Sequence, residues 1–490
     1  MNKRRLFASA MAACMLLSTM PSTALASDIN PNATIVSNAE ASEGTDGTGG
    51  ETEAPAAATE VSTLDALKKA IESGETNIKL TDNIQLDAQL TINKNVTLDL
   101  DNFKLSHSDT QANSKALYIT DACVVTIKNG NIEKTGSGFG LYLNNEANVT
   151  LENVTVTGFD AGAQVVNSTL TIDENSTVTS SEESQKYGRA DGINAYYDSE
   201  IIVNGGTIRG LGDSGVELYH TSSLTLNDGT VEGEGYGAWI VGGEFKMTAG
   251  TIKSERPIVL DSYKADYDSN KKITISGGNV TSSGSADIIQ EAAATNFGNT
   301  VSVNVTGGTF SKAIPTDYVN SSIYTVDHDE NANTWTVRPY TATFQLDNTN
   351  VYTANADAIT IGTFEGMKAQ LENQVTAPDG CKFVGWKAQG ATENVALTGN
   401  FRITEDITYV PVFKSTNATL SALTYQVGND TNVYTVNLDT TQTTYDVTLP
   451  AGTEDGTVVS VYGIANDTNV TAPLYSTATL NNGEATAPSP

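Results

Sequence analysis

Two aspartates in this chain lie where a sugar-cleaving enzyme could use them. Asp191 belongs to the segment "RADGINAYYDSEIIVNGGTIRG", residues 189–210, and Asp213 lies in the turn that follows. Glycosidic hydrolysis needs two carboxyl groups, because one protonates the leaving oxygen while the other assists attack on the opposite face of the sugar. Aspartates also occur in turns for a structural reason, since their side chains hydrogen-bond to backbone N–H groups. We favour the structural interpretation and keep catalysis as the alternative.

Both aspartates belong to a repeat of about 22 residues. A small or turn residue opens each apolar segment, at Gly140, Gly162, Gly192, Gly215, Gly237 and Pro257. Each unit alternates short apolar strands with Asn, Asp or Gly turns and contains no helical pattern. One such unit cannot bury its apolar face alone, so the units are expected to stack into a β-solenoid. Two insertions interrupt the repeat, "SEESQKYG" at 181–188 and "KADYDSNKK" at 264–272.

The alternation of each first strand predicts which side chains point outward. Two and four positions after the small residues, the outward positions of neighbouring units hold aromatic, amide and carboxylate side chains. Aromatic rings can stack on the C–H faces of sugars, and the polar groups can bond sugar hydroxyls. We therefore predict ligand binding by Asn194, Tyr196, Glu217, Tyr219 and Trp239. We expect the insertions to wall this strip into a groove. The alternative is an aromatic ladder that only stiffens an exposed sheet face.

The start of the repeat carries a helical segment, "VSTLDALKKAIESG". Ser62 with Asp65 predicts a helix N-cap, and Gly74 predicts the helix end. With the coils that follow, this segment resembles the right-handed parallel β-helix proteins of the pectin-lyase-like superfamily, from about residue 61 to 339. The resemblance implies an all-β fold with an N-terminal capping helix. That superfamily contains lyases, hydrolases and non-catalytic adhesins, so the fold alone does not choose a function.

Within that superfamily, the polygalacturonase type is most similar to the opening segment. The resemblance aligns Asp191 with its first catalytic aspartate and Asp213 with the first of its aspartate pair. The second member of the pair is Ser214 here, the histidine position is Tyr236, and the Arg-Ile-Lys region reads "RPIVL", residues 256–260. These departures argue against this family's chemistry in the present chain.

Two further segments complete the predicted organisation. Residues 341–414 resemble the β-grasp-like repeats of bacterial surface proteins, through Phe383, Gly385 and Trp386 and the closing segment "ITEDITYVPVF". Residues 415–490 resemble the cadherin-like β-sandwich modules of the same kind of protein. We therefore predict a signal peptide at 1–26, a disordered acidic linker at 27–60, the β-helix with its cap at 61–340, and two small β domains.

The N-terminal residues indicate the cellular compartment, and the net charge excludes some classes of partner. A basic "MNKRR", a short apolar run and small residues up to Ala26 are typical of a cleaved bacterial secretory signal. The net charge is −31, and it becomes −34 once Lys3, Arg4 and Arg5 leave with the signal. Such an acidic chain argues against nucleic acid and anionic membranes as partners, because both bind clustered Lys and Arg, and more weakly against acidic polysaccharides. We also expect no membrane insertion after the signal is cleaved.

The sequence predicts no cofactor. Two cysteines remain after the signal, Cys123 and Cys381, and no Cys/His cluster suggests a disulfide framework or a zinc site. The acidic loops "SEESQ" and "DSYKADYDSN" offer oxygen ligands of the kind that Ca²⁺ accepts, and solvated loops are the alternative.

These observations predict a secreted or cell-surface binding protein of the adhesin kind. Its partner would be a glycan or another host or bacterial surface ligand, held on the outer face of the β-helix. The alternative is a polysaccharide-active enzyme, a hydrolase or a lyase, that uses Asp191 and Asp213.

Overall fold

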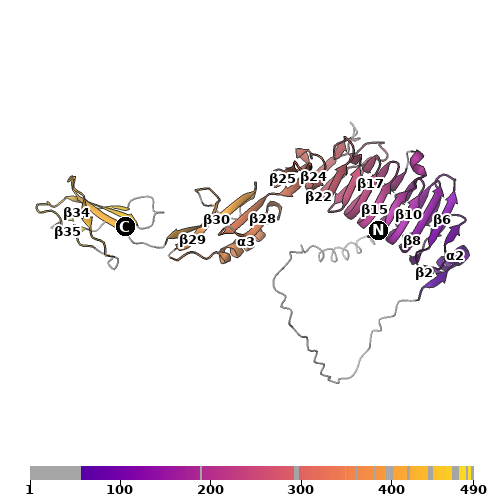
Figure 1. The fold of residues 1–490 in the computed structure, drawn as a ribbon, viewed down its shortest axis with the longest axis horizontal. Coiled ribbons are helices and arrows are strands. Elements are labelled where there is room, and N and C mark those ends of the chain that lie inside the picture. Colours follow the sequence, from indigo (N-terminus) through magenta and orange to yellow (C-terminus); the bar gives the residue numbers. More distant parts are fainter. Residues whose placement is uncertain are drawn as a thin grey trace, which may run out of the picture. The chain divides into compact units, whose positions relative to one another are not determined.

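The fold is described by a computed structural model (Figure 1). It describes residues 57–187, 190–291, 297–347, 349–359, 361–379, 381–392, 394, 397, 401–415, 420–439, 445–465, 474–481 and 484–486. The predicted signal peptide, nearly all of the predicted acidic linker and Arg189 lie outside these residues.

A short helix covers the N-terminal end of the solenoid. Strand β1 (Thr59–Val61) pairs with β2 (Asn77–Leu80), and α2 (Leu64–Ser73) lies between them in the chain. The expected N-cap at Ser62 is wrong by one residue, because the side chain of Thr63 accepts the Ala66 N–H. Gly74 ends the helix in the left-handed conformation, as predicted. The apolar stripe of α2 is buried against the first coils, so the first strands are not left as an open edge.

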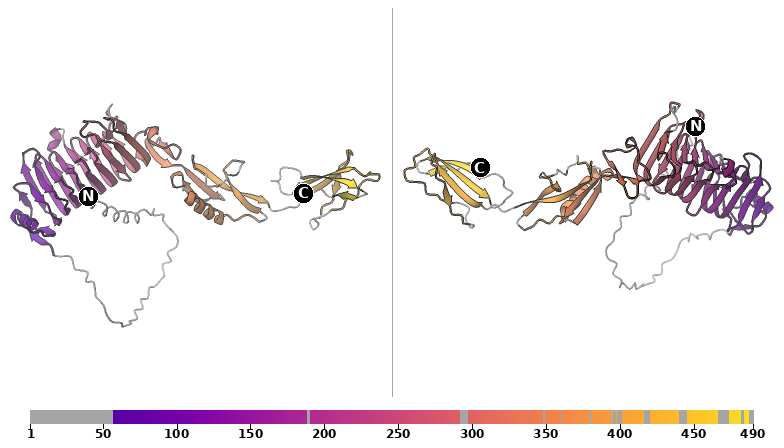
Figure 2. Two further views of the ribbon diagram at one scale, coloured as in Figure 1. Left: turned by 180° about the vertical axis from the view of Figure 1, so that it is seen from behind. Right: turned by 45° about the horizontal axis from the view of Figure 1, so that its top comes forward.

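The repeat folds into a parallel β-helix, which confirms the predicted solenoid (Figures 1 and 2). One face is a nine-stranded parallel sheet, here called sheet B, with one strand from each coil. In spatial order its strands are β4 (Leu90–Ile92), β7 (Lys115–Ile119), β9 (Phe139–Leu143), β11 (Ala161–Val166), β14 (Asp191–Tyr196), β16 (Ser214–Leu218), β18 (Tyr236–Ile240), β21 (Arg256–Leu260) and β23 (Ile289–Glu291).

The other two faces of each coil belong to sheet A, whose strands run on from one face to the next. Its strands are β1, β2, β3 (Ile84–Leu86), β5 (Val96–Asp99), β6 (Lys104–Asp109), β8 (Val124–Gly136), β10 (Asn148–Gly158), β12 (Thr169–Ile172), β13 (Thr177–Ser180), β15 (Glu200–Gly210), β17 (Ser223–Gly233), β19 (Gly243–Met247), β20 (Thr251–Ser254), β22 (Lys271–Ser282), β24 (Val301–Phe310), β25 (Tyr324–Asp329) and β26 (Thr334–Pro339). The last two close the sheet as an antiparallel hairpin.

Stacked asparagines make one of the corners of the coil. Asn129 and Asn153 have φ angles of 56° and 57°, a left-handed conformation that asparagine tolerates better than most residues. The Asn153 side chain donates to the Asn129 side chain at 3.2 Å, and Asn227 donates to Asn204 at 2.9 Å. These bonds link asparagines of neighbouring coils along the solenoid axis.

A glycine is the second residue of five sheet B strands, and close packing requires it there. A Cβ added at Gly192 would lie 2.4 Å from the carbonyl oxygen of Gly215 and 2.5 Å from Cγ2 of Ile208 on sheet A. The backbone of sheet B therefore approaches its neighbours too closely for a side chain at this position. In β7, β9, β11, β14, β16, β18 and β21, the third and fifth residues then point inward and form part of one continuous apolar core.

Two smaller sheets follow the β-helix. Sheet C has the order β28 (Thr349–Asn355), β27 (Thr341–Leu346), β30 (Ile407–Ser415) and β29 (Cys381–Ala388), and α3 (Ile361–Gln374) follows β28. Its core contains Trp386, which packs edge-on against Phe344 at 5.1 Å. Sheet D has the order β32 (Tyr434–Val436), β31 (Leu420–Val427), β33 (Val458–Ala465), β34 (Leu474–Asn481) and β35 (Glu484–Thr486). The chain is thus mostly β, as predicted.

Candidate functional site

The predicted outward row is continuous across sheet B. Asn194 on β14 pairs with Glu217 on β16, which pairs with Trp239 on β18. In the next outward row, the rings of Tyr196 and Tyr219 stack with centroids 4.7 Å apart and an interplanar angle of 5°. The five predicted binding residues therefore lie together, and all five line one cavity of about 750 Å³.

The floor of this cavity is more enclosed than the sequence indicated. An exposed face was expected, but Glu217 and Tyr219 are only 6% and 7% accessible to solvent. Tyr219 is covered by the stacked ring of Tyr196 and by the edges of Trp239 and Tyr267. Tyr196 and Trp239 are half-buried, and they offer the accessible aromatic surface of the floor.

The second insertion supplies one wall of the cavity. Tyr263, Lys264 and Tyr267 line the cavity, and the carbonyl oxygen of Tyr267 accepts the His220 N–H at 2.8 Å. The segment ends on a fully buried ion pair, in which the Lys271 ammonium lies 2.7 Å from the Asp268 carboxylate. This pair holds the insertion in place where the chain enters β22, so the segment that forms the wall is fixed at its C-terminal end.

The first insertion does not wall the groove, contrary to expectation. It forms the 3-10 helix η2 (Ser184–Tyr187), and Gln185 bonds the carboxylate of Glu234, away from the cavity. None of its described residues is among those that line the cavity.

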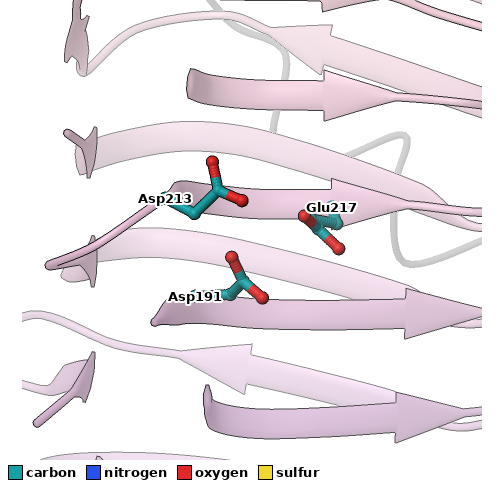
Figure 3. Close-up of side chains that lie close together, drawn as sticks. All are labelled: Asp191, Asp213 and Glu217. Carbon is teal, nitrogen blue, oxygen red and sulfur yellow. The ribbon is translucent and has the colours of Figure 1, made fainter. Parts of the chain in front are cut away.

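Three carboxylates meet inside the cavity (Figure 3). Asp191 begins β14, Asp213 precedes β16, and Glu217 lies within β16, so neighbouring coils bring them to the same face. One carboxylate oxygen from each residue lies within 4.8 Å of one from each of the others. Asp191 also accepts the Ser214 N–H at 3.1 Å, so it bridges two coils as well as facing the cavity. The turn interpretation of Asp191 and Asp213 was therefore incomplete.

Burial and like charges perturb Glu217 strongly. Loss of solvent raises the pKa of Glu217 to about 8, and the negative charges of Asp191 and Asp213 act in the same direction. The Tyr219 hydroxyl and the Ser214 hydroxyl bond its two oxygens at 2.8 and 3.1 Å, which partly opposes the increase. Glu217 therefore holds a proton near neutral pH. Burial also raises the pKa of Tyr219, so its hydroxyl stays protonated.

The cluster of Asp191, Asp213 and Glu217 is also the candidate cation site among the described residues. Its ligands are all oxygen atoms, which suits a hard cation such as Ca²⁺ or Mg²⁺. The acidic loops "SEESQ" and "DSYKADYDSN", which the sequence offered for Ca²⁺, form no such group within the part of the chain that the structure describes.

The residues that depart from the polygalacturonase pattern have other contacts here. Ser214 bonds Glu217, as described above. The Tyr236 ring stacks on Trp239 with centroids 5.6 Å apart, and the Arg256 guanidinium donates to the Tyr236 hydroxyl at 3.2 Å. These side chains support the aromatic floor at its β18 and β21 end.

Sequence reasoning missed two features of the site. It placed Glu217 among the sugar-binding residues but did not connect it with the aspartates. The signal was present, because Asp213 and Glu217 are four residues apart and an extended strand places such residues on one face. It also left out Tyr263 and Tyr267, whose only signal is one tyrosine directly before a polar insertion and one within it.

Comparison with known proteins agrees with the fold. A family model described as the right handed beta helix region matches residues 89–251, which include all three clustered carboxylates. No curated protein and no solved structure gives a significant match to the chain. The match and the stacked sheets show that this region of the chain is a right-handed parallel β-helix. In the described part of the chain, no helix is long and apolar enough to cross a membrane.

Proposed function

We propose that this protein is an exported adhesin-like protein that binds carbohydrate in the cavity over sheet B. The observation that carries the proposal is the composition of the cavity, in which half-buried Tyr196 and Trp239 adjoin amide and carboxylate groups. Flat rings bind the C–H faces of sugars, and a few placed polar groups orient the hydroxyls.

A buried acceptor supports the same proposal. Within the described residues, the side-chain oxygen of Asn194 is buried and has no hydrogen-bond donor. A buried polar atom without a partner costs free energy, and a sugar hydroxyl would supply the missing donor. Four carboxylates and one lysine line the cavity, so a neutral sugar fits there better than an acidic one.

The two small sheets fit the same role. Their resemblance to β-grasp-like and cadherin-like modules of bacterial surface proteins supports a function as spacers that present the β-helix outside the cell. Secretion and a surface location are part of the proposal, and they rest on the signal-like residues 1–26.

The test is a binding screen of the full chain against neutral oligosaccharides, followed by calorimetry. We expect Trp239→Ala and Tyr196→Ala to weaken binding at least tenfold. Tyr197→Ala is the matched control, because Tyr197 is 52% exposed, neighbours Tyr196 in sequence and does not line the cavity. Binding that is unchanged in the first two variants, or no binding across the screen, would refute the proposal.

A second candidate function is glycoside hydrolysis, which the carboxylate cluster favours. Protonated Glu217 could act as the acid, and Asp191 or Asp213 as the nucleophile or base. The carboxylate oxygens of these residues lie within 4.8 Å of one another. This distance is nearer to the roughly 5 Å between the two carboxyl groups of retaining glycosidases than to the roughly 6.5–9.5 Å of inverting glycosidases, which leaves room for a water molecule. The assay is reducing-sugar release from neutral polysaccharides by the wild type, Asp213→Asn and Glu217→Gln. Turnover that is equal in all three proteins, or no turnover, would refute this candidate.

A further inference from the structure

A second aromatic surface adjoins the cavity on the N-terminal side of the carboxylates. Tyr118 on β7 and Tyr142 on β9 pair in register on the outer face of sheet B, and both rings are half-buried. Their centroids lie 5.6 Å apart, edge to face. Phe139 connects this surface with the cavity, because it lines the cavity and lies 6.1 Å from Tyr142.

A lysine stands over these two rings. The Lys115 ammonium lies 4.6 Å from the ring centroid of Tyr142 and 5.6 Å from that of Tyr118. Among the residues that the structure describes, no carboxylate lies within ion-pair distance of Lys115, whereas other lysines of the coils, such as Lys104 and Lys272, pair with glutamates. Lys115 therefore carries a positive charge over an aromatic surface without a carboxylate partner.

We infer that Lys115, Tyr118 and Tyr142 form a distal subsite for a sugar residue that carries a carboxylate or sulfate group. The ring faces would contact the sugar, and the ammonium would pair with its anionic group. This inference rests on the proposed carbohydrate binding and adds to it the kind of chain that is bound.

The arrangement of charge along sheet B sets the order of the sugars. Three coil steps separate Tyr142 on β9 from Glu217 on β16, which is about 14 Å at the usual spacing of neighbouring strands. One extended sugar residue advances by about one such step. The bound chain would therefore place neutral sugars over Asp191, Asp213 and Glu217, and an anionic sugar about three residues away over Lys115.

The experiment compares matched oligosaccharides by calorimetry on the full chain. One series is neutral, one carries a terminal uronic acid, and one carries a terminal sulfated sugar. We expect the wild type to bind the anionic series about fivefold more tightly at low salt, which is the range of a partly exposed ion pair. The preference should shrink at 0.5 M salt because the pair is screened.

The informative variant is Lys115→Met, which keeps an apolar chain over the two rings and removes the charge. It should abolish the preference for anionic ends and leave the affinity for the neutral series unchanged. Lys246→Met, an exposed lysine on β19 of sheet A, is the matched control and should change neither. A wild type that binds neutral chains without any preference overturns this inference alone, whereas failure to bind any chain overturns the proposed function with it.

Discussion

Glu217 gives the sharpest test of the electrostatics in the cavity. The perturbation is Glu217→Gln, which has nearly the same shape and keeps groups that can bond Tyr219 and Ser214. Its amide is a neutral equivalent of the protonated carboxyl group. The variant therefore removes the ionisation of this residue while changing its packing very little.

The pKa of about 8 sets the sign and the size of the effect. Between about pH 4.5 and 8, the unfolded chain has released a proton that the folded chain still holds on Glu217. The stability of the folded wild type therefore falls as the pH rises through this window. At pH 7 the cost is on the order of 3 kcal/mol, at about 1.4 kcal/mol for each pH unit above the unfolded pKa.

Thermal unfolding across pH 4 to 9 measures this cost. We expect Glu217→Gln to match the wild type near pH 4 and to melt about 6 °C higher at pH 7, at roughly 2 °C per kcal/mol for a unit of this size. Glu152→Gln, an exposed position on β10, should follow the wild type at every pH. If Glu217→Gln melts at or below the wild type throughout, the reasoning about its raised pKa is wrong.

Three further predictions concern the scaffold. Gly192→Ala should destabilise the β-helix by about 3 kcal/mol in denaturant unfolding, because its Cβ would collide with the neighbouring coil. Ordinary surface substitutions change stability by about 0.5 kcal/mol, so a smaller loss than that would contradict the close packing. Asp268→Asn should cost about 3 kcal/mol and expose the insertion to proteolysis, because it leaves the buried Lys271 ammonium without its counter-charge, whereas Asp268→Leu with Lys271→Met should recover most of that loss. Hydrogen bonds from Arg338 lower the pKa of Asp406 to about 2, so that contact stabilises the fold above about pH 4 and is lost as the pH falls towards 2. Since both groups are partly exposed, the change should stay below about 1 kcal/mol. It should shrink in Arg338→Met, where the hydrogen bonds from Thr341 to Asp406 remain.

The solenoid could be predicted from the sequence because its signal is repeated and local. A small residue, two inward apolar positions and a turn recur in each coil, and the period-two geometry of a strand decides which side chains face the core. The same rule correctly paired Asn194 with Glu217 and Tyr196 with Tyr219. The helix cap was missed by one residue because Ser62 and Thr63 have the same capping chemistry.

The enclosure of the site depended on contacts between distant segments. The sequence could not show that the insertion at 264–272 folds over the floor while the one at 181–188 does not, because loop paths follow from tertiary contacts such as those of Tyr267 and of the Asp268–Lys271 pair. Nor could it show that Glu217 is buried beside Asp191 and Asp213 and holds its proton. The sequence alone thus determined the repeat, the outward rows and the acidic character of the chain. Only the tertiary structure decided that those rows close into a cavity, because burial and charge proximity depend on neighbouring coils and on the loop that covers them.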